Sequence, residues 1–326
     1  MSDSASQSSP VAEGSPPPFQ EEFLGYWRKV PDKGLFLGLA VPWLLLFQFL
    51  GNSTLGYGAS ASLYEWMANI YGSDFSDESH GFLIPFVVAY LLWDKREELA
   101  RVEPRNWAAG LVALGGAAAM HVIGFAIQQG RVSVVALFVG LYAIMGIVWG
   151  GSLLKAAFFP YVLFVFCMPL GGLTDSITVP LRVLVTEVSV WGGANILNAD
   201  VINDGSRILH RGGDYHYDVA PACSGIRSLT ALLILTTIVA FVSISVWWRR
   251  LTLIAAAIPV AIAGNVLRIT AVIVAGEAFG QDAGALVHDH AWILTWGLAL
   301  VCMWGLFVWL TRGLEPRTGD AKGGAT

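Results

Sequence analysis

The sequence has little charge. Asp, Glu, Lys and Arg make up only 13% of its 326 residues, and hydrophobic residues make up 55%. A soluble domain carries roughly a quarter of charged residues. The apolar residues occur in long blocks, the mean hydropathy is +0.61, and a helix needs about 20 apolar residues to cross a hydrocarbon core about 30 Å thick. This composition excludes an ordinary soluble domain and predicts an all-α membrane protein whose main partner is the lipid bilayer.

Basic runs, a leader and paired cysteines are also lacking. The net charge is −5 and the pI is about 5.7, so no basic footprint for nucleic acid is present. The first 20 residues lack the basic and apolar regions of a signal peptide. Three cysteines cannot all pair. Cys167 and Cys302 lie inside apolar runs, where cysteine usually acts as a small hydrophobe, whereas Cys223 does not.

The chain divides into three parts by composition. Residues 1–20 are rich in Ser and Pro and predict a disordered tail, residues 21–312 predict one polytopic membrane domain, and residues 313–326 predict a disordered cytoplasmic tail. About eight transmembrane helices are predicted in the middle part, near residues 35–51, 80–94, 107–127, 132–150, 152–168, 224–247, 251–276 and 291–311.

Basic residues predict the orientation of these spans. Clusters flank the first, second, sixth and last spans, and the positive-inside rule places all of them in the cytoplasm. The segment 176–197 carries Arg182 and Glu187, which favours an amphipathic helix in the outer interface over a span. Both termini are then cytoplasmic, and the loop 199–222 lies outside. Its turn residues predict a small extracytoplasmic hairpin.

Cys223 lies between this hairpin and a long apolar helix. Pro221 marks a helix start and places Cys223 in or next to the first turn. Unpaired N–H groups and the helix dipole at such a position lower the pKa of a thiol and favour the nucleophilic thiolate. A lone cysteine at a tight helix start is more often a small buried residue, so Cys223 needs partners.

Arg268 is the first candidate partner. It lies seventeen residues after Leu251, about 25 Å along the predicted helix and near its outer end. An arginine there can stabilise a thiolate or an oxyanion, or it can snorkel to the interface or pair with Glu277. Asn265 shares its face and can orient it. Arg227, one turn deeper than Cys223, can share the task or pair with Glu187.

Histidines provide the second candidate partner. His288 and His290 flank Asp289 at the predicted outer start of the last span, where either imidazole can act as general base and acid. They can also be polar residues of the interface, with Asp289 as a helix N-cap. No second cluster has metal-ligand spacing, so neither a metal nor another cofactor is expected.

These motifs resemble the exosortase/archaeosortase family of membrane transpeptidases, over roughly residues 50–312. Residues 222–226 (Ala-Cys-Ser-Gly-Ile) match its cysteine motif, residues 265–268 its Asn-x-x-Arg, and His288 its late histidine. Trp292 stands near where a glycine is expected, so His290 stays an alternative to His288, which is preferred because an acidic residue follows it. Residues 79–83 resemble an early Ser-His-Gly-Phe-Leu segment, with His80 in a supporting role.

The resemblance implies a cysteine peptidase of the cytoplasmic (inner) membrane that cuts C-terminal, PEP-CTERM-like sorting signals of exported proteins. Its active site would face the periplasm or exterior. Cys223 would form the acyl-enzyme, His288 would move the proton and Arg268 would hold the developing charge. The alternatives are a polytopic transporter, which would place polar residues at mid-membrane in several helices, and a non-catalytic subunit of envelope or exopolysaccharide assembly. A rhomboid-like serine protease is disfavoured because Gly-x-Ser-x-Gly is missing.

Overall fold

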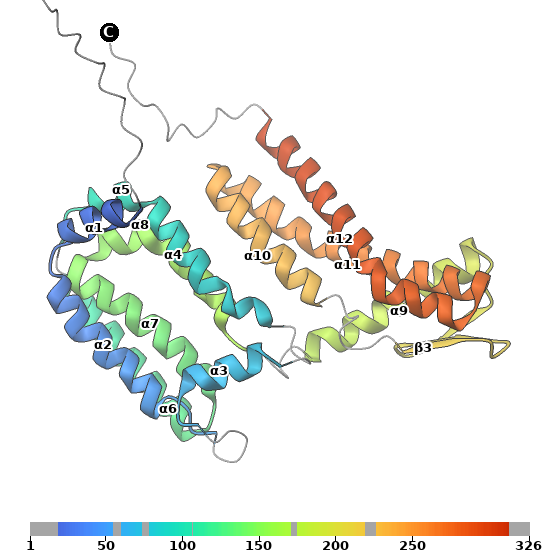
Figure 1. Ribbon diagram of the computed structural model, residues 1–326, viewed down its shortest axis with the longest axis horizontal. Coiled ribbons are helices and arrows are strands. Elements are labelled where there is room, and N and C mark those ends of the chain that lie inside the picture. Colours follow the sequence, from blue (N-terminus) through green and yellow to red (C-terminus); the bar gives the residue numbers. More distant parts are fainter. Residues whose placement is uncertain are drawn as a thin grey trace, which may run out of the picture. The chain divides into compact units, whose positions relative to one another are not determined.

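The computed structural model describes residues 19–54, 60–73, 78–105, 107–170, 175–218 and 226–312. These residues are helical apart from short connections and one small sheet (Figure 1), which confirms the all-α membrane fold. The predicted tails lie almost entirely outside the described residues, and the first helix, α1 (Phe19–Lys29), begins at Phe19.

The predicted spans all fall on apolar helices. In the described part of the chain, six helices are long and apolar enough to cross a membrane: α2 (Lys33–Leu50), α6 (Ala109–Ala126), α7 (Gly130–Trp149), α10 (Ile226–Ser243), α11 (Trp247–Phe279) and the 293–311 part of α12 (Gln281–Thr311). The other two predicted spans are shorter apolar helices. These are α4 (Ile84–Asp94), and α8 (Gly151–Val162) with its 3₁₀ extension η2 (Leu163–Cys167).

The chain forms two compact units. The first combines residues 1–63 with 86–162, and contains α2, α6, α7 and α8 with the short helices α1 and α5 (Arg96–Ala100). Its centre is α7, which packs against α2, α6 and α8. Gly140 of α7 has no side chain, and the ring of Trp43 occupies that space, with its Nε1 donating to the carbonyl oxygen of Leu137 at 3.0 Å. Small residues allow such close approach between membrane helices.

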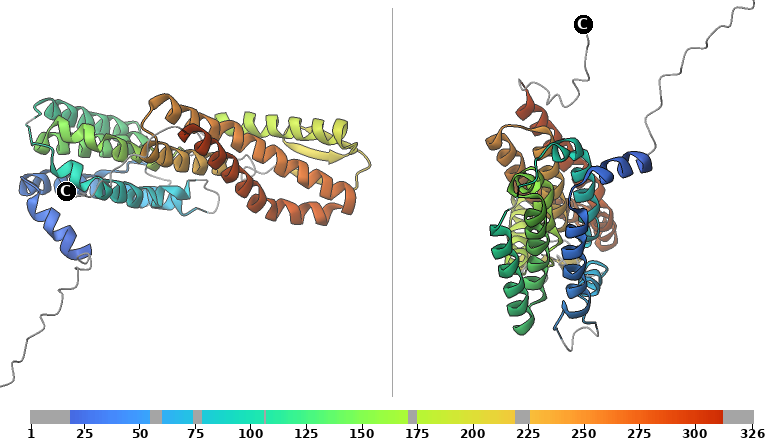
Figure 2. Two further views of the ribbon diagram at one scale, coloured as in Figure 1. Left: turned by 90° about the horizontal axis from the view of Figure 1, so that it is seen from above. Right: turned by 90° about the vertical axis from the view of Figure 1, so that its left-hand side faces the viewer.

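The second unit combines residues 64–85 with 163–326 and contains the predicted site. Its helices are α3 (Leu63–Tyr71), the 3₁₀ turn η1 (Ser79–Phe82), α9 (Asp175–Ile196) and α10 to α12. Helix α11 packs on α10, α12 and α9, and the views in Figure 2 show α11 and α12 running side by side. The apolar core between α10, α11 and α12 includes Leu232, Leu253 and Met303.

Helices α11 and α12 are longer than predicted. They have 33 and 31 residues and are joined at Gly280, whose φ of 85° lies in the left-handed region. At about 1.5 Å per residue each exceeds a hydrocarbon core of about 30 Å. The predicted span 291–311 matches the apolar part of α12, Ile293–Thr311, but the helix itself begins at Gln281, so the prediction that residues 288–290 lie at the start of the last helix was wrong. Hydropathy marks only the apolar part of a helix, and here a stretch of mixed polar and apolar residues, 281–290, continues it for almost three more turns.

The predicted hairpin is confirmed and gains a third strand. Strands β1 (Val201–Asp204), β2 (Arg207–His210) and β3 (His216–Asp218) form an antiparallel sheet in that order. Gly205 and Gly213 lie in its two connections with φ of 60° and 82°, where glycine has no steric penalty.

The sheet and α9 both pack on α11. Val201, Ile208 and Tyr215 of the sheet region share one apolar core with Val185 of α9 and Ile273 of α11, and Figure 2 shows the strands beside these helices. Ser189 Oγ of α9 donates to the carbonyl oxygen of Val266 at 3.2 Å. One turn further, Gly193 lies against Ile273, so α9 and α11 run in the same direction. The placement of α9 in the membrane interface stays a prediction.

Candidate active site

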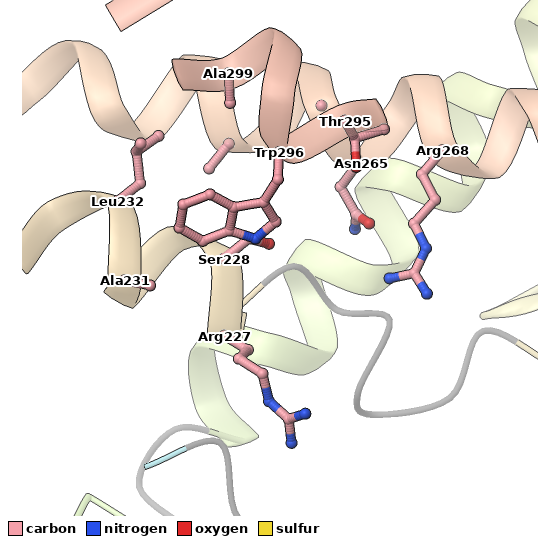
Figure 3. Close-up of a pocket in the computed structure, with 11 residues that line it drawn as sticks. Arg227, Ser228, Ala231, Leu232, Asn265, Arg268, Thr295, Trp296 and Ala299 are labelled. Atoms are coloured by element: carbon pink, nitrogen blue, oxygen red, sulfur yellow. The ribbon is translucent and has the colours of Figure 1, made fainter. Parts of the chain in front are cut away.

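A pocket of about 460 Å³ lies between α10, α11 and α12 (Figure 3). One part is apolar and includes Leu232, Ala261 and Ala299. The other part is polar and is lined by Arg227, Ser228, Asn265, Arg268 and Thr295. The indole of Trp296 lies between the two parts. The pocket therefore offers a cationic region next to an apolar one.

Helix periodicity explains the polar side. Asn265 and Arg268 are three residues apart on α11 and share a face, and both line the pocket. Asn265 is buried, with 6% of its surface exposed. Gly264 of α11 faces the Thr295 main chain of α12, where an added Cβ would lie 3.9 Å from the Thr295 carbonyl oxygen, an ordinary van der Waals contact. The two helices thus bring the Asn-x-x-Arg motif against the last span.

Arg268 reaches across to α12. Its Nη2 donates to the carbonyl oxygen of His288 at 2.8 Å. Its Nε is buried and has no hydrogen-bond partner among the described residues. No Asp or Glu is among the described residues that line the pocket. A guanidinium held in this way is a fixed positive charge that favours an anionic or developing-anionic group.

His288 is therefore placed by Arg268, although its position on the helix differs from the prediction. It lies two turns inside α12 and not at its start, and Asp289 cannot be the N-cap because Gly280 occupies that position. The Nδ1 atom of His288 lies 3.1 Å from Oδ1 of Asp289. A carboxylate at this distance orients an imidazole.

The other predicted supporting residues separate into two groups. Arg227, on α10, lines the same pocket as Arg268. His290 is exposed, and its Nδ1 lies 2.9 Å from the carbonyl oxygen of Leu286 in its own helix. His80 lies in η1, and the residues that line the pocket do not include it. The structure brings together Arg227, Asn265 and Arg268, with the main chain of His288.

The segment around His80 has a packing role. Gly81 lies against the ring of Tyr71, where a Cβ atom would come within 2.5 Å of Cζ. The Tyr71 hydroxyl donates to the carbonyl oxygen of Cys167, whose thiol in turn lies 3.8 Å from the Gly81 carbonyl oxygen. Residues 79–82 therefore join α3 to η2.

Cys223 lies outside the described residues, as do Ser224 and Pro221. The described chain ends at Asp218 of β3 and resumes at Ile226 of α10. The other two cysteines are free, Cys167 buried and Cys302 exposed. Among the described residues, no group of three or more His, Cys, Asp or Glu could hold a metal ion.

Glu277, considered as a partner of Arg268, bonds elsewhere. Its Oε2 accepts a hydrogen bond from the Tyr215 hydroxyl at 2.8 Å and lies 3.9 Å from Nε2 of His210. Nine residues separate it from Arg268 on α11, a rise of about 13 Å. Glu277 therefore belongs to the contact between the sheet and α11.

The comparison with protein families matches residues 73–308 to the family described as transmembrane exosortase, which is more than half of the chain. The chain belongs to this family. No curated protein and no solved structure matches it. The exosortases are membrane cysteine-type transpeptidases, so the protein is a multi-pass member of a transpeptidase family. The match begins shortly before η1 and ends within α12, so it includes the whole pocket.

Sequence reasoning missed part of this exosortase pocket. Ser228, Thr295 and Trp296 line it, yet none was singled out. Thr295 offered one weak signal, because it lies seven residues after His288 and so shares its face of α12. Trp296 lies in an apolar span, where an indole is indistinguishable from a packing residue.

Proposed function

We propose that this exosortase is a cysteine peptidase/transpeptidase that cleaves C-terminal sorting signals, PEP-CTERM-like in form, of membrane-anchored exported proteins. The cleavage would occur at the outer face of the cytoplasmic membrane. The observation that carries the proposal is the hydrogen bond from Arg268 to His288 at the edge of a cationic pocket. It joins two of the three residues that the chemistry requires, and they come from different helices.

The chain itself limits where the third residue lies. Three peptide units join Cys223 to Ile226, the first described residue of α10, so their Cα atoms are at most about 11 Å apart. Arg227, the next residue, lines the pocket. In the sequence Cys223 therefore directly precedes the helix whose Arg227 lines the pocket, and this proximity along the chain supports its role as the nucleophile.

The proposed reaction has two steps. His288 takes the proton of the Cys223 thiol, and the thiolate attacks the scissile carbonyl carbon to give a tetrahedral oxyanion beside Arg268. The intermediate collapses to a thioester, and His288 returns the proton to the leaving amine. An acceptor nucleophile then attacks the thioester, and its proton passes through His288 to the departing thiolate. Charge and protons balance in each step.

The apolar part of the pocket suits a substrate that is held in the membrane. Ala231, Leu232, Ala261 and Ala299 present small and aliphatic side chains next to the polar residues. A sorting signal whose transmembrane helix follows its cleavage motif would place an apolar segment beside the scissile bond. The pocket likewise has an apolar part next to a cationic part.

The experiment follows processing of a co-expressed substrate that carries a candidate C-terminal sorting signal. Wild type, Cys223→Ala and Cys302→Ala are compared by mobility shift, with the amount of each enzyme measured in the membrane fraction. Cys302 is exposed on α12 and serves as the matched control. We expect Cys223→Ala to abolish processing and Cys302→Ala to retain it. Continued processing by Cys223→Ala at normal enzyme levels would favour a transporter or a non-catalytic assembly subunit.

A further inference from the structure

Helix α1 carries a row of aromatic side chains along one face. Phe19, Phe23 and Trp27 recur at intervals of four residues, which places them on the same side of the helix. Their rings stack in order, with centroids 6.1 Å apart for the first pair and 6.4 Å apart for the second. Phe19 is 63% exposed, Phe23 is 44% exposed and the neighbouring Leu24 is 48% exposed. The described protein therefore leaves much of this apolar face uncovered.

The opposite face of α1 is charged. At about 100° of rotation per residue, this face is formed by Glu21, Glu22, Arg28 and Lys29. No residue of α1 is buried, so the helix does not belong to the apolar core of its unit. A helix with one apolar and one charged face that packs into no core is typical of a segment that lies in a membrane interface.

The chain connects α1 to the start of the first predicted span. Only residues 30–32 separate α1 from α2, and Asp32, with a φ of 47°, lies in this turn. The Nζ atom of Lys33 donates to the carbonyl oxygens of Trp27 and Arg28, both at 3.3 Å, and so ties the two helices together. Figure 2 shows α1 running across the direction of α2 and out from the helices of its unit. This is the direction of a helix that lies along a bilayer surface.

Two other apolar helices end at the same level. Trp93, near the end of α4, packs against three aromatic rings of α1 with centroids 5.2 to 5.8 Å apart. Trp149, at the end of α7, donates from Nε1 to the carbonyl oxygen of Pro31 at 2.8 Å. Tryptophan is enriched where membrane helices reach the headgroups. The start of α2 and the ends of α4 and α7 thus place α1 at the depth of the membrane interface.

An ion pair fixes the rotation of α1 about its axis. The Nε atom of Arg96 in α5 donates to Oε1 of Glu22 at 3.0 Å, and Nη2 lies 2.7 Å from the same oxygen. The guanidinium also lies over the rings of Trp93 and Tyr26, 4.8 and 5.5 Å from their centroids, a favourable cation–π geometry. Rotation of α1 would separate these groups, so the aromatic row keeps its exposed orientation.

We propose that α1 is an interfacial anchor whose partner is the phospholipid surface. Its apolar face, centred on Phe23, enters the acyl-chain layer just below the headgroups, and its charged face turns to the headgroups and water. The positive-inside rule predicts that this surface is the cytoplasmic one. Lipid suits this face better than a second protein, because the helix lies where three membrane helices end. The inference is independent of the proposed peptidase reaction.

The test measures the surroundings of both faces in the full-length protein. Phe23→Cys and Gly25→Cys are made separately in a background with Cys223→Ala and Cys302→Ser, and each is labelled with the fluorophore NBD; Cys167 stays because it is buried. The two labelled positions are about 200° apart around the helix. No described atom lies within 4 Å of a Cβ at position 25, so the control label has room. The proteins are reconstituted into bilayers of phosphatidylcholine and phosphatidylglycerol.

Two quenchers distinguish lipid from water. A lipid with a doxyl group high on its acyl chain quenches a label just below the headgroups, whereas iodide quenches a label in water. We expect position 23 to be quenched by this lipid, to be protected from iodide and to emit at shorter wavelength than position 25. Position 25 should show the reverse preference. A doxyl group deep in the acyl chain should quench position 23 less than the shallow one, because α1 lies across the spans.

Three outcomes would overturn the inference. Equal iodide quenching at both positions would place α1 in water, and protection of position 23 from both quenchers would mean that protein covers the aromatic row. Stronger quenching by the deep doxyl group would place the label in the bilayer core. Because Phe23→Cys removes a ring that contacts Trp93, Leu24→Cys repeats the measurement outside the aromatic row. The same lipid quenching is expected there, and iodide quenching as strong as at Gly25→Cys would count against the anchor.

Discussion

Arg268 contacts α12 with one nitrogen and leaves another without a partner among the described residues. Its Nη2 bonds to the His288 carbonyl oxygen at 2.8 Å, and its buried Nε has no such bond. A lysine at this position would keep the charge but lose the planar fork that serves two acceptors at once. The guanidinium can therefore serve a second acceptor besides the His288 carbonyl oxygen.

The first prediction concerns this residue. We expect Arg268→Lys to lower processing by at least about 100-fold, as for loss of an oxyanion donor. Arg249→Lys is the matched control, because Arg249 also lies on α11 and its Nη1 donates to a main-chain carbonyl of α12, that of Leu310, at 2.8 Å. Processing rates per folded enzyme check this. Equal rates for Arg268→Lys and wild type would mean that only the charge matters.

The second prediction separates the two histidines of α12. His288 has its carbonyl held by Arg268 and its ring next to Asp289, whereas the ring of His290 is exposed and bonds within its own helix. We expect His288→Ala to lower processing at least about 100-fold, the range for loss of a general acid–base. His290→Ala should retain most of the activity. The reverse result in the same gel assay would assign the proton transfer to His290.

The pocket was predictable from sequence only where polar residues interrupt apolar helices. Asn265, Arg268 and Arg227 were found in this way, because charge in a membrane helix is costly and points to a function. Thr295 and Trp296 were not found, because a hydroxyl or an indole in a span has ordinary packing roles. The contact of Gln281 with β3 was not found either, because it joins residues far apart in the sequence.

At the scale of elements, sequence located the helices but not their ends. Hydropathy predicted α11 and α12 because their apolar parts are long. The predicted last span begins near residue 291, ten residues after the first residue of α12. The extra turns are of mixed polarity and are stabilised by contact with the sheet, whose third strand was also missed. Short β3 has only three residues, and its place in the sheet depends on pairing with β2.

The third prediction concerns the fit between the sheet and α12. A Cβ on Gly284 would overlap the Tyr217 hydroxyl, whereas nothing lies within 4 Å of a Cβ on Gly297 in the same helix. We expect Gly284→Ala to destabilise the protein by about 1–3 kcal/mol, as overpacking does. Gly297→Ala should be neutral or stabilising by up to about 1 kcal/mol. Apparent melting temperatures in detergent at one scan rate should fall only for Gly284→Ala.

At the scale of the whole chain, contacts inside each unit agree with the predicted topology. In the first unit, Arg96 pairs with Glu22 at 2.7 Å and the Trp149 indole donates to the Pro31 carbonyl oxygen at 2.8 Å. The loops around 31, 95 and 150 therefore lie at one end of this unit. The positive-inside rule predicts the first two in the cytoplasm, and the alternation of the predicted spans predicts the third there as well. In the second unit, Arg249 and Leu310 mark one end of α11 and α12, and the hydrogen bond between Gln281 and His216 of β3 marks the other.

The fourth prediction tests this topology in intact cells. Arg101→Cys and Asp204→Cys are made separately in a background with Cys223→Ala and Cys302→Ser, and both positions are exposed. A membrane-impermeant maleimide should label position 204 in intact cells, and position 101 only after the membrane is opened. Asp204 lies at the end of β1, so labelling there places the sheet outside. The opposite pattern would put the sheet in the cytoplasm. An exported substrate could not present its sorting signal there, and the proposed function would have to be abandoned.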